Sequence, residues 1–533
     1  MKNILIINLR KLGDVFTTGH LITSLKAKYP SAKIHFLVYK ESENAAALLA
    51  DIFQVVAIDR KKMATLGSKK IFNKAFSIET LLDTFSVLPE TFDLVINHSN
   101  DLVATLLTAY FSENSTDWAG IRFNSKDIVE YSGNWSVAYN DLSSEFANSY
   151  FNYVDLIHKI VGIPPSRQRS RLKDSQSHTK AWDGVLNKIR SENLSTSELK
   201  FIGISPFSSS DSKDIPLGCL EELFSQIYDD LNLFPILIIA PSAKERMAAE
   251  ELNKRLGNGL VTVEADFLAT TSILQQINFL VTCDSSIKHL ADLNKVPLLE
   301  INYGVTSFSK QGPSSKNSLI LCFNSNQALS QSQDIYASMK FSLDAIPHEH
   351  LHLGNGALFR TTCDSLGTKY EHVTGLLKIE QQVRYEMGRA IAFGLCNNVD
   401  IPRPHIAFCT GLEEILRTQA NSFQFILKSI LHLLRELPEL ETKNKRCETF
   451  ISELSALFTN LSEDNLFSIP LIIWRTQLSL LSDNLFDNRK LFEKSIFELK
   501  NNCLKVDNFL RSIANNLDQQ QEADLGRKYL SVL

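Results

Sequence analysis

The sequence lacks a hydrophobic run long enough to cross a membrane. An apolar stretch at residues 233–240 is among the longest, contains Pro235, and is far shorter than the ~20 residues that a membrane-spanning helix needs. The N-terminus has only the apolar residues 4–7 before Asn8, which is too short for the core of a signal peptide. We therefore expect a cytoplasmic protein, with peripheral attachment to the inner face of the inner membrane as the furthest membrane association.

An excess of charge of one sign is also lacking, and so are paired cysteines. Lys and Arg number 55 and Asp and Glu number 60, a net charge of -5, which disfavours binding to nucleic acid through bulk positive charge. The eight cysteines show no C-x-x-C pair or metal-finger spacing, so we expect reduced, mostly structural thiols. With 44% hydrophobic and 22% charged residues, the chain is typical of soluble globular domains and not of a disordered protein.

The first part of the chain alternates between strand and helix patterns. An apolar run at 4–7, a polar turn, a helical pattern at 15–29 and a second apolar run at 33–38 together predict a βαβ unit. Further strands are expected at 55–58 and 93–96, and a helix at 102–111. Strands that are apolar on both faces indicate a parallel sheet covered by helices.

A second α/β series begins near residue 201, after a polar stretch at 164–200 that predicts a linker. We expect strands at 201–205, 236–240, 279–282 and 297–301 and helices at 217–231 and 243–256. Beyond residue 375 the apolar spacing is helical only, as at 412–434 and 492–517. The predicted domains are two α/β domains at 1–165 and 166–355 and a helical bundle at 376–533.

Asp14 is the first candidate for chemistry. It follows the first strand directly, and Gly13 before it permits a tight turn. A carboxylate at the carboxyl end of a parallel strand lies at the mouth of the cleft and can act as a general base. The same residue can simply cap the next helix, and a carboxylate can do both.

Two further segments indicate a site for phosphate. Residues 282–290 run from a strand into a helix, whose first turn offers free backbone N–H groups and a positive dipole end. Residues 205–213 form a polar loop that ends in Lys213, a cation that can neutralise a diphosphate. An ordinary helix cap in the first segment and an exposed loop lysine in the second are the structural alternatives.

Taken in this order, the segments resemble glycosyltransferase family 9, the ADP-heptose:lipopolysaccharide heptosyltransferases. The resemblance covers about residues 1–355 and implies the GT-B fold of two facing Rossmann-like domains. It rests on six segments in the order of the family, namely 4–15, 25–30, 92–96, 119–122, 205–213 and 284–292.

The resemblance also implies roles for particular residues. Asp14 is similar to the base that deprotonates the acceptor hydroxyl, and Lys213 to the lysine that steadies the donor phosphates. The further donor-binding candidates are Ser205, Glu245, Asp284, Ser285, Ser286 and His289. The acceptor-binding candidates are Arg10, Lys11, His98 and Asn100, and a turn-forming role is the alternative for the last two.

The implied reaction is an inverting, metal-independent transfer of heptose from ADP-heptose to a cell-envelope saccharide or a protein. The nucleotide sugar is a co-substrate, and no cofactor or metal is expected. The three histidines at 348–352 are interpreted as surface residues rather than metal ligands. No family is recognised for the helical region, whose stripes indicate its own core or a surface for a protein partner.

Three departures from the family pattern leave other functions open. Ser286 and Phe207 stand where the family has glycine, and Gly19 stands where proline is common. The 21 glycines are about 4% of the chain, below the average of ~7%. A catalytically degenerate scaffold that acts through its helical domain, and a GT-B sugar-nucleotide epimerase, are therefore the alternative functions.

Overall fold

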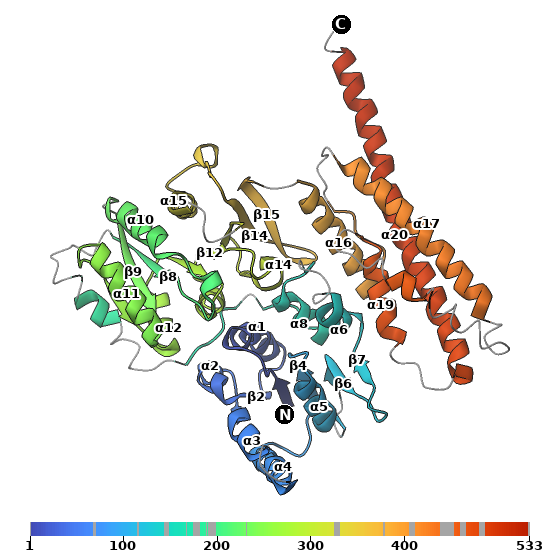
Figure 1. Ribbon diagram of the computed structural model, residues 1–533, viewed down its shortest axis with the longest axis horizontal. Helices are drawn as coiled ribbons and strands as arrows, with labels where there is room; N and C mark the ends of the chain where they lie inside the picture. The colour runs from blue at the N-terminus through green and yellow to red at the C-terminus, as the bar shows by residue number, and fades with distance from the viewer. Residues whose placement is uncertain are drawn as a thin grey trace. The chain divides into compact units, whose positions relative to one another are not determined.

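The computed structural model contains two α/β domains followed by a helical region (Figure 1). The described residues are 2–67, 71–113, 117–142, 149–166, 168–173, 182–187, 189, 199–230, 232–324, 331–376, 379–404, 411–437, 452, 454–458, 465–478 and 485–530. Most of the linker expected at 164–200 lies outside them.

The N-terminal domain is a five-stranded parallel sheet with the strand order β3-β2-β1-β4-β5. Its strands are β1 (Asn3–Ile7), β2 (Lys33–Tyr39), β3 (Gln54–Ile58), β4 (Leu94–Asn97) and β5 (Trp118–Ala119). Its helices are α1 (Leu12–Lys28), α2 (Glu43–Ala47), α3 (Arg60–Gly67), α4 (Ile71–Phe85), α5 (Leu102–Ser112) and α8 (Tyr153–Val161). The strand order is that of a Rossmann-like sheet, whose order reverses between β1 and β4.

The second domain repeats this order and extends it. The order of its sheet is β10-β9-β8-β11-β12-β13-β14-β15. The pairing is parallel up to β13, and β14 pairs antiparallel with both β13 and β15. The strands are β8 (Lys200–Ser205), β9 (Leu233–Ile239), β10 (Thr262–Glu264), β11 (Phe279–Cys283), β12 (Leu298–Asn302), β13 (Leu319–Cys322), β14 (Ala357–Asp364) and β15 (Gly367–Gly375). The helices are α10 (Leu217–Tyr228), α11 (Ala243–Arg255), α12 (Phe267–Leu274), α13 (Ser286–Leu293), α14 (Phe308–Gln311) and α15 (Gln331–Ser342).

The apolar composition of the central strands explains why they form where the sequence predicts them. Every residue of β9 and β11 is buried, because helices cover both faces of the sheet. Pro235 is tolerated inside β9 because the pairing with β10 begins only at Leu237, so no neighbour on that side needs its missing N–H.

The helical region forms the second of two compact units. The first unit comprises residues 1–122 and 151–376, and the second comprises 123–150 and 377–533. The second unit contains β7 (Val129–Tyr131), α6 (Asn134–Val137), α16 (Ile379–Asn397), α17 (Leu412–Glu436), α19 (Ser468–Leu478) and α20 (Leu485–Leu530), and β6 (Ile121–Phe123) leads into it. The all-α C-terminal bundle expected from the sequence is thus confirmed, together with the two α/β domains.

Residues 123–150 are held in the second unit by specific contacts. Trp135 donates its indole N–H to Asn397 at 3.0 Å and meets Phe393 edge to face at 6.0 Å. Buried aromatic rings also join the other helices, such as Phe423 and Phe467, which stack at 5.4 Å. The chain therefore enters this unit twice, once from within the N-terminal domain sequence and once at its end.

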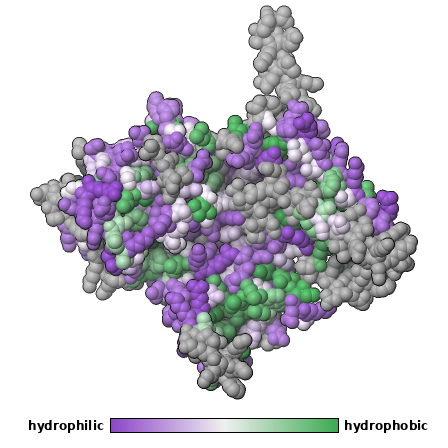
Figure 2. Space-filling view, in the orientation of Figure 1, coloured by the Kyte–Doolittle hydropathy of each residue, from purple (hydrophilic) through white to green (hydrophobic). Residues whose placement is uncertain are grey.

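No described helix has the length and hydropathy needed to cross a bilayer. One surface of the first unit is nevertheless apolar, and Figure 2 shows it as a green area low in the view, where α5 lies in Figure 1. Leu102, Val103, Leu106 and Tyr110 of α5 are between 42% and 65% exposed. Their spacing places them on one side of the helix.

Candidate functional site

A cavity of about 680 Å³ lies between the two α/β domains of the first unit, at the carboxyl ends of β1, β8 and β11. This is the point of each sheet where the strand order reverses and where ligands of open α/β sheets bind. The N-terminal domain contributes Arg10, Lys11, Leu12, Gly13 and Asp14. The polar residues from the second domain are Ser205, Ser208, Ser209, Lys213, Glu245, Thr270, Asp284, Ser285, Ser286, His289, Thr306 and Gln311.

Asp14 lies in the first turn of α1, at the N-terminal wall of the cavity. The helix begins at Leu12, so the capping position belongs to Lys11, whose side chain makes no cap. The Asp14 carboxylate accepts a hydrogen bond from the Lys11 backbone N–H. The Asn8 amide donates to the Asp14 carbonyl oxygen at 2.9 Å and fixes the turn. Asp14 therefore supports the helix start and faces the cavity at the same time, as half of a capping box.

The surroundings of Asp14 favour a carboxylate that can take up a proton. Burial raises its pKa, and the charge of Asp284 across the cavity acts in the same direction. Arg10, the Lys11 backbone and the Lys11 charge act against burial, but the net pKa stays above the usual value for aspartate. A carboxylate with a raised pKa is a better general base than an ordinary one.

Asp284, at the end of β11, is the most strongly held carboxylate of the site. Its Oδ2 atom accepts hydrogen bonds from Lys213 Nζ at 2.6 Å and Thr306 Oγ1 at 2.5 Å, and its Oδ1 atom accepts one from Lys288 Nζ at 2.5 Å. Burial alone would raise its pKa, but Lys288, His289 and Lys213 outweigh this and hold the pKa well below its usual range. Asp284 is therefore ionised at any physiological pH.

The two domains approach most closely where α1 meets α13, and two glycines allow this. A Cβ atom at Gly13 would lie 2.8 Å from the His289 ring, and one at Gly19 would lie 2.9 Å from the Leu293 methyl groups. A proline at position 19 would meet the same methyl groups, which gives a physical reason for the glycine. Burial lowers the pKa of His289 to about 3, so its imidazole is neutral at pH 7.

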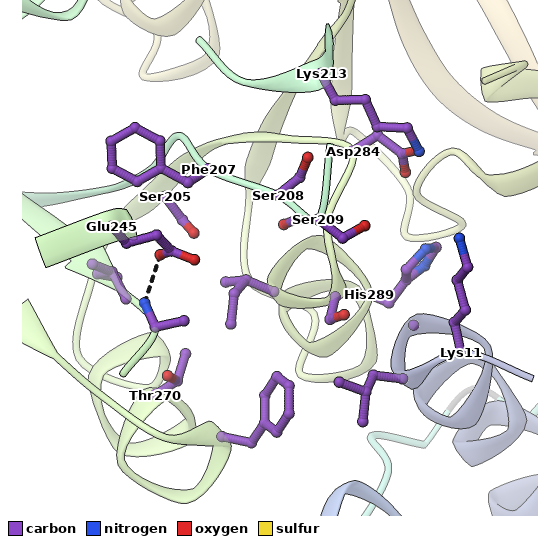
Figure 3. Close-up of a pocket in the computed structure, with 18 of the residues that line it drawn as sticks. Lys11, Ser205, Phe207, Ser208, Ser209, Lys213, Glu245, Thr270, Asp284 and His289 are labelled. Carbon is purple, nitrogen blue, oxygen red and sulfur yellow. Dashed lines mark hydrogen bonds and ion pairs between the residues drawn. The ribbon is translucent and has the colours of Figure 1, made fainter. Parts of the chain in front are cut away.

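The other donor-side candidates line the same cavity, as Figure 3 shows. Glu245 accepts a hydrogen bond from the Ala240 backbone N–H at 2.7 Å and a further one from the Ser242 side chain. Burial raises the pKa of Glu245. Phe207 also lines the cavity, yet it is only 8% exposed and belongs to the core of the second domain, so its ring takes little cavity space.

Two of the acceptor-side candidates do not line this cavity. His98 is buried behind the first strand, where its Nδ1 atom lies 2.8 Å from Thr18 Oγ1, and burial lowers its pKa to about 3. Asn100 is half-buried at the same strand end. Arg10 and Lys11, the other two candidates, line the cavity from the N-terminal domain, and Figure 3 shows Lys11 at its edge.

Two residues near the site were not selected from the sequence. Lys288 is completely buried and bonded to Asp284, and its position four residues after that carboxylate is the usual signal for such a pair. Tyr153, at the start of α8, has its ring 5.9 Å from the Arg10 guanidinium, and burial raises its pKa. No local pattern links Tyr153 to Arg10, because the fold alone brings them together. Among the described residues, no group of three or more His, Cys, Asp or Glu is placed to hold a metal ion.

The two Rossmann-like sheets, packed through α1 and α13 around a polar cavity, define the GT-B architecture. Residues 86–339 match the model of glycosyltransferase family 9 (heptosyltransferase). Residues 86–339 are therefore a glycosyltransferase family 9 domain, and this match supports sugar transfer as the general class of activity.

Solved structures of two heptosyltransferases and of a family 9 glycosyl transferase are similar to part of the chain. The E. coli heptosyltransferase WaaC with ADP is 15% identical with a TM-score of 0.47, and the alignment covers 64% of this chain and 100% of that one. The E. coli ADP-heptose lps heptosyltransferase II is 16% identical with a TM-score of 0.44, covering 64% and 98%. A glycosyl transferase family 9 protein from Veillonella parvula is 13% identical with a TM-score of 0.45, covering 65% and 90%. No curated protein matches the chain.

Proposed function

We propose that the protein is an inverting glycosyltransferase that moves heptose from ADP-heptose to a saccharide of the cell envelope, as in lipopolysaccharide biosynthesis, or to a protein. The observation that carries the proposal is the arrangement of the cavity. One wall bears a carboxylate with a raised pKa, and the opposite wall bears a lysine and a helix start. These are the two parts that an inverting transfer needs.

In the proposed reaction, Asp14 removes the proton from the acceptor hydroxyl as its oxygen attacks the anomeric carbon. The bond between that carbon and the diphosphate oxygen breaks, and ADP leaves with the electron pair. Lys213 and the backbone N–H groups at the start of α13 stabilise the charge that develops on the diphosphate. Since cationic and N–H groups supply this stabilisation, we propose a metal-independent transfer without a covalent intermediate.

The remaining candidates divide between the two substrates. On the donor side, Ser205, Ser285 and Ser286 supply hydroxyl groups and Glu245 supplies a carboxylate that can accept from a ribose hydroxyl, while neutral His289 can donate or accept one hydrogen bond. On the acceptor side, Arg10 and Lys11 face the cavity directly. In this proposal His98 and Asn100 shape the acceptor side from behind the cavity lining.

The helical unit is proposed to bring the acceptor to the site or to bind a protein partner. The support is the place of residues 123–150 in the chain. Residues on both sides of this segment belong to the first unit, whereas the segment itself packs within the helical unit. The N-terminal domain is the one that bears Asp14 and the acceptor candidates. Both ends of the 123–150 segment are joined to this domain, so the helical unit is suited to take part in acceptor binding.

We also propose that the protein associates peripherally with the inner face of the inner membrane. Its support is the exposed apolar side of α5, formed by Leu102, Val103, Leu106 and Tyr110. Large exposed apolar patches are characteristic of interaction surfaces. Flotation with phospholipid vesicles tests this, and the proposal expects the double variant Leu102→Glu, Leu106→Glu to bind fewer vesicles than the wild type.

One observation favours the alternative of a catalytically degenerate scaffold. Ser286, the first residue of α13, lines the cavity with a side chain where the family pattern has glycine. A side chain there restricts how closely a phosphate can approach the backbone N–H groups. A scaffold would bind donor weakly and release no ADP.

Product analysis by mass spectrometry tests the proposal against both alternatives. The full-length protein is incubated with ADP-heptose and deacylated lipopolysaccharide core as the acceptor. The proposal expects release of ADP together with an acceptor that is heavier by one heptosyl group. Conversion of the donor sugar without a glycoside product would indicate an epimerase, and unchanged donor and acceptor would support the scaffold.

A further inference from the structure

Behind the cavity, Asp284 belongs to a closed ring of hydrogen bonds that continues into the core of the second domain. Lys288 Nζ lies 2.5 Å from Asp284 Oδ1 and 3.2 Å from Glu300 Oε1, so it joins the two carboxyl groups. Asn302 donates to Glu300 at 3.1 Å and to the carbonyl oxygen of Thr306 at 3.1 Å. Thr306 closes the ring through its hydroxyl bond to Asp284.

Four of the five residues of this ring are buried, and Thr306 is half-buried at the cavity. Lys288 and Glu300 are both 0% exposed, and Asn302 and Asp284 are 4% and 9% exposed. An ionised lysine without water around it is costly unless carboxylates surround it. The two carboxyl groups therefore keep the Lys288 ammonium in one place, with its charge directed at Asp284.

Lys213 contacts the ring from the side of the cavity. Its ammonium donates to Asp284 Oδ2 at 2.6 Å and its side chain is 21% exposed, whereas Lys288 approaches the other oxygen from inside the core. An ammonium group has three N–H donors. Lys213 can therefore bind a diphosphate oxygen while it stays bonded to Asp284. This requires that the Asp284 carboxylate does not fully compensate the positive charge of Lys213.

The charges show why a second lysine is needed. A nucleoside diphosphate brings negative charge into a cavity where Asp284 already carries one. With Lys213 alone, that single positive charge would be shared between Asp284 and the diphosphate, which repel each other. Burial raises the pKa of Glu300 and so favours its uncharged form, which leaves the charge of Lys288 to neutralise Asp284 before the ligand arrives.

We propose that Lys288 is a positioning residue that neutralises Asp284 from within the core and so leaves the charge of Lys213 for the diphosphate of the donor. Glu300 and Asn302 hold Lys288 and the 302–306 turn in place. This inference rests on the proposed function, because it assumes that a nucleoside diphosphate binds in the cavity.

The test compares the binding of ADP and adenosine by the full-length protein and its variants, by isothermal titration calorimetry. Lys288→Gln removes the charge but keeps an amide that can donate to both carboxyl groups. We expect its Kd for ADP to rise about tenfold, which corresponds to 1.4 kcal/mol, and its Kd for adenosine to change less than about twofold. Lys288→Arg keeps the charge and should recover most of the ADP affinity.

Lys340→Gln is the matched control. Lys340 is paired with Asp230 in the same domain, neither residue lines the cavity, and its variant should bind ADP as the wild type does. If Lys288→Gln does not fold, the double variant Lys288→Met, Glu300→Gln removes the buried ammonium together with its second carboxyl partner and should show the same selective loss of ADP binding.

Four results would overturn the inference. ADP binding equal to that of the wild type in Lys288→Gln would show that the charge does not matter. Equal losses for ADP and adenosine, or failure of both charge-removing variants to melt cooperatively, would show that Lys288 only supports the fold. A wild type that binds neither ADP, UDP nor GDP would refute the proposed function itself, and the inference would fall with it.

Discussion

Replacing Asp14 by asparagine removes the proposed base with little other change. The asparagine side-chain oxygen can still accept the hydrogen bond from the Lys11 backbone N–H that Asp14 accepts. The Asn8 bond is made to the main chain of residue 14, so it does not depend on the side chain. The variant should therefore keep the turn after β1 and the start of α1.

The expected loss of activity follows from the role of a general base. Such a group contributes about 10²–10⁴-fold to the rate, or roughly 2.7–5.4 kcal/mol at 1.36 kcal/mol per tenfold. The donor site lies on the opposite wall, so Kd for ADP should change less than about twofold. We expect the effect in kcat and not in donor binding.

The folded stability gives an independent control. Since burial raises the pKa of Asp14 in the folded state, the ionised form opposes folding above the ordinary pKa of aspartate. Asp14→Asn should then unfold at the same temperature as the wild type at neutral pH, or higher. The measurements are the rate of ADP release and a thermal melt of each protein, and turnover at the wild-type rate by the folded variant would refute the assignment.

Two further predictions concern the architecture of the site, and a third concerns the helical unit. Gly13→Ala places a Cβ atom 2.8 Å from the His289 ring and should raise KM for the donor about tenfold or more, whereas Gly218→Ala, with open space around it, should not. Asp284→Asn should lower the free energy of unfolding by about 3–5 kcal/mol in urea at pH 7, and by less as the pH falls below the ordinary pKa of aspartate, because Asp284 then takes up a proton in the unfolded wild type while it stays ionised in the folded one. A chain ending at residue 376 should aggregate on size-exclusion chromatography, because buried residues of the 123–150 segment such as Trp135 lose their cover; a monomeric, active protein would contradict the division into two units.

The strands and helices of the two α/β domains were predictable because their apolar patterns are strong and local. The runs at 4–7, 279–282 and 297–301 are strands in the structure within a residue or two of the expected ends. The hairpin of β14 and β15 was not predicted, since its outer strand alternates only weakly between buried and exposed residues.

The site was predictable only in part, because only some of its residues lie in local sequence patterns. Asp14 and Lys213 lie in the segments that follow β1 and β8, and the carboxyl ends of parallel strands meet at one edge of a sheet. The packing of 123–150 with the helical unit depends on contacts such as Trp135 with Asn397, more than 200 positions apart, and no periodicity reports such contacts. Glu300 did carry a signal, because a single acid in an otherwise apolar strand points to a buried partner.

The central claim is that the cavity binds a nucleoside diphosphate through Lys213. A thermal-shift panel of ADP, UDP, GDP and CMP against the wild type and Lys213→Ala tests it most directly, because a ligand at 100 times its Kd stabilises by ~2.7 kcal/mol. The account predicts that ADP alone raises the melting temperature of the wild type and that the shift disappears in Lys213→Ala. The absence of any shift with all four nucleotides, or an equal shift in both proteins, would contradict it.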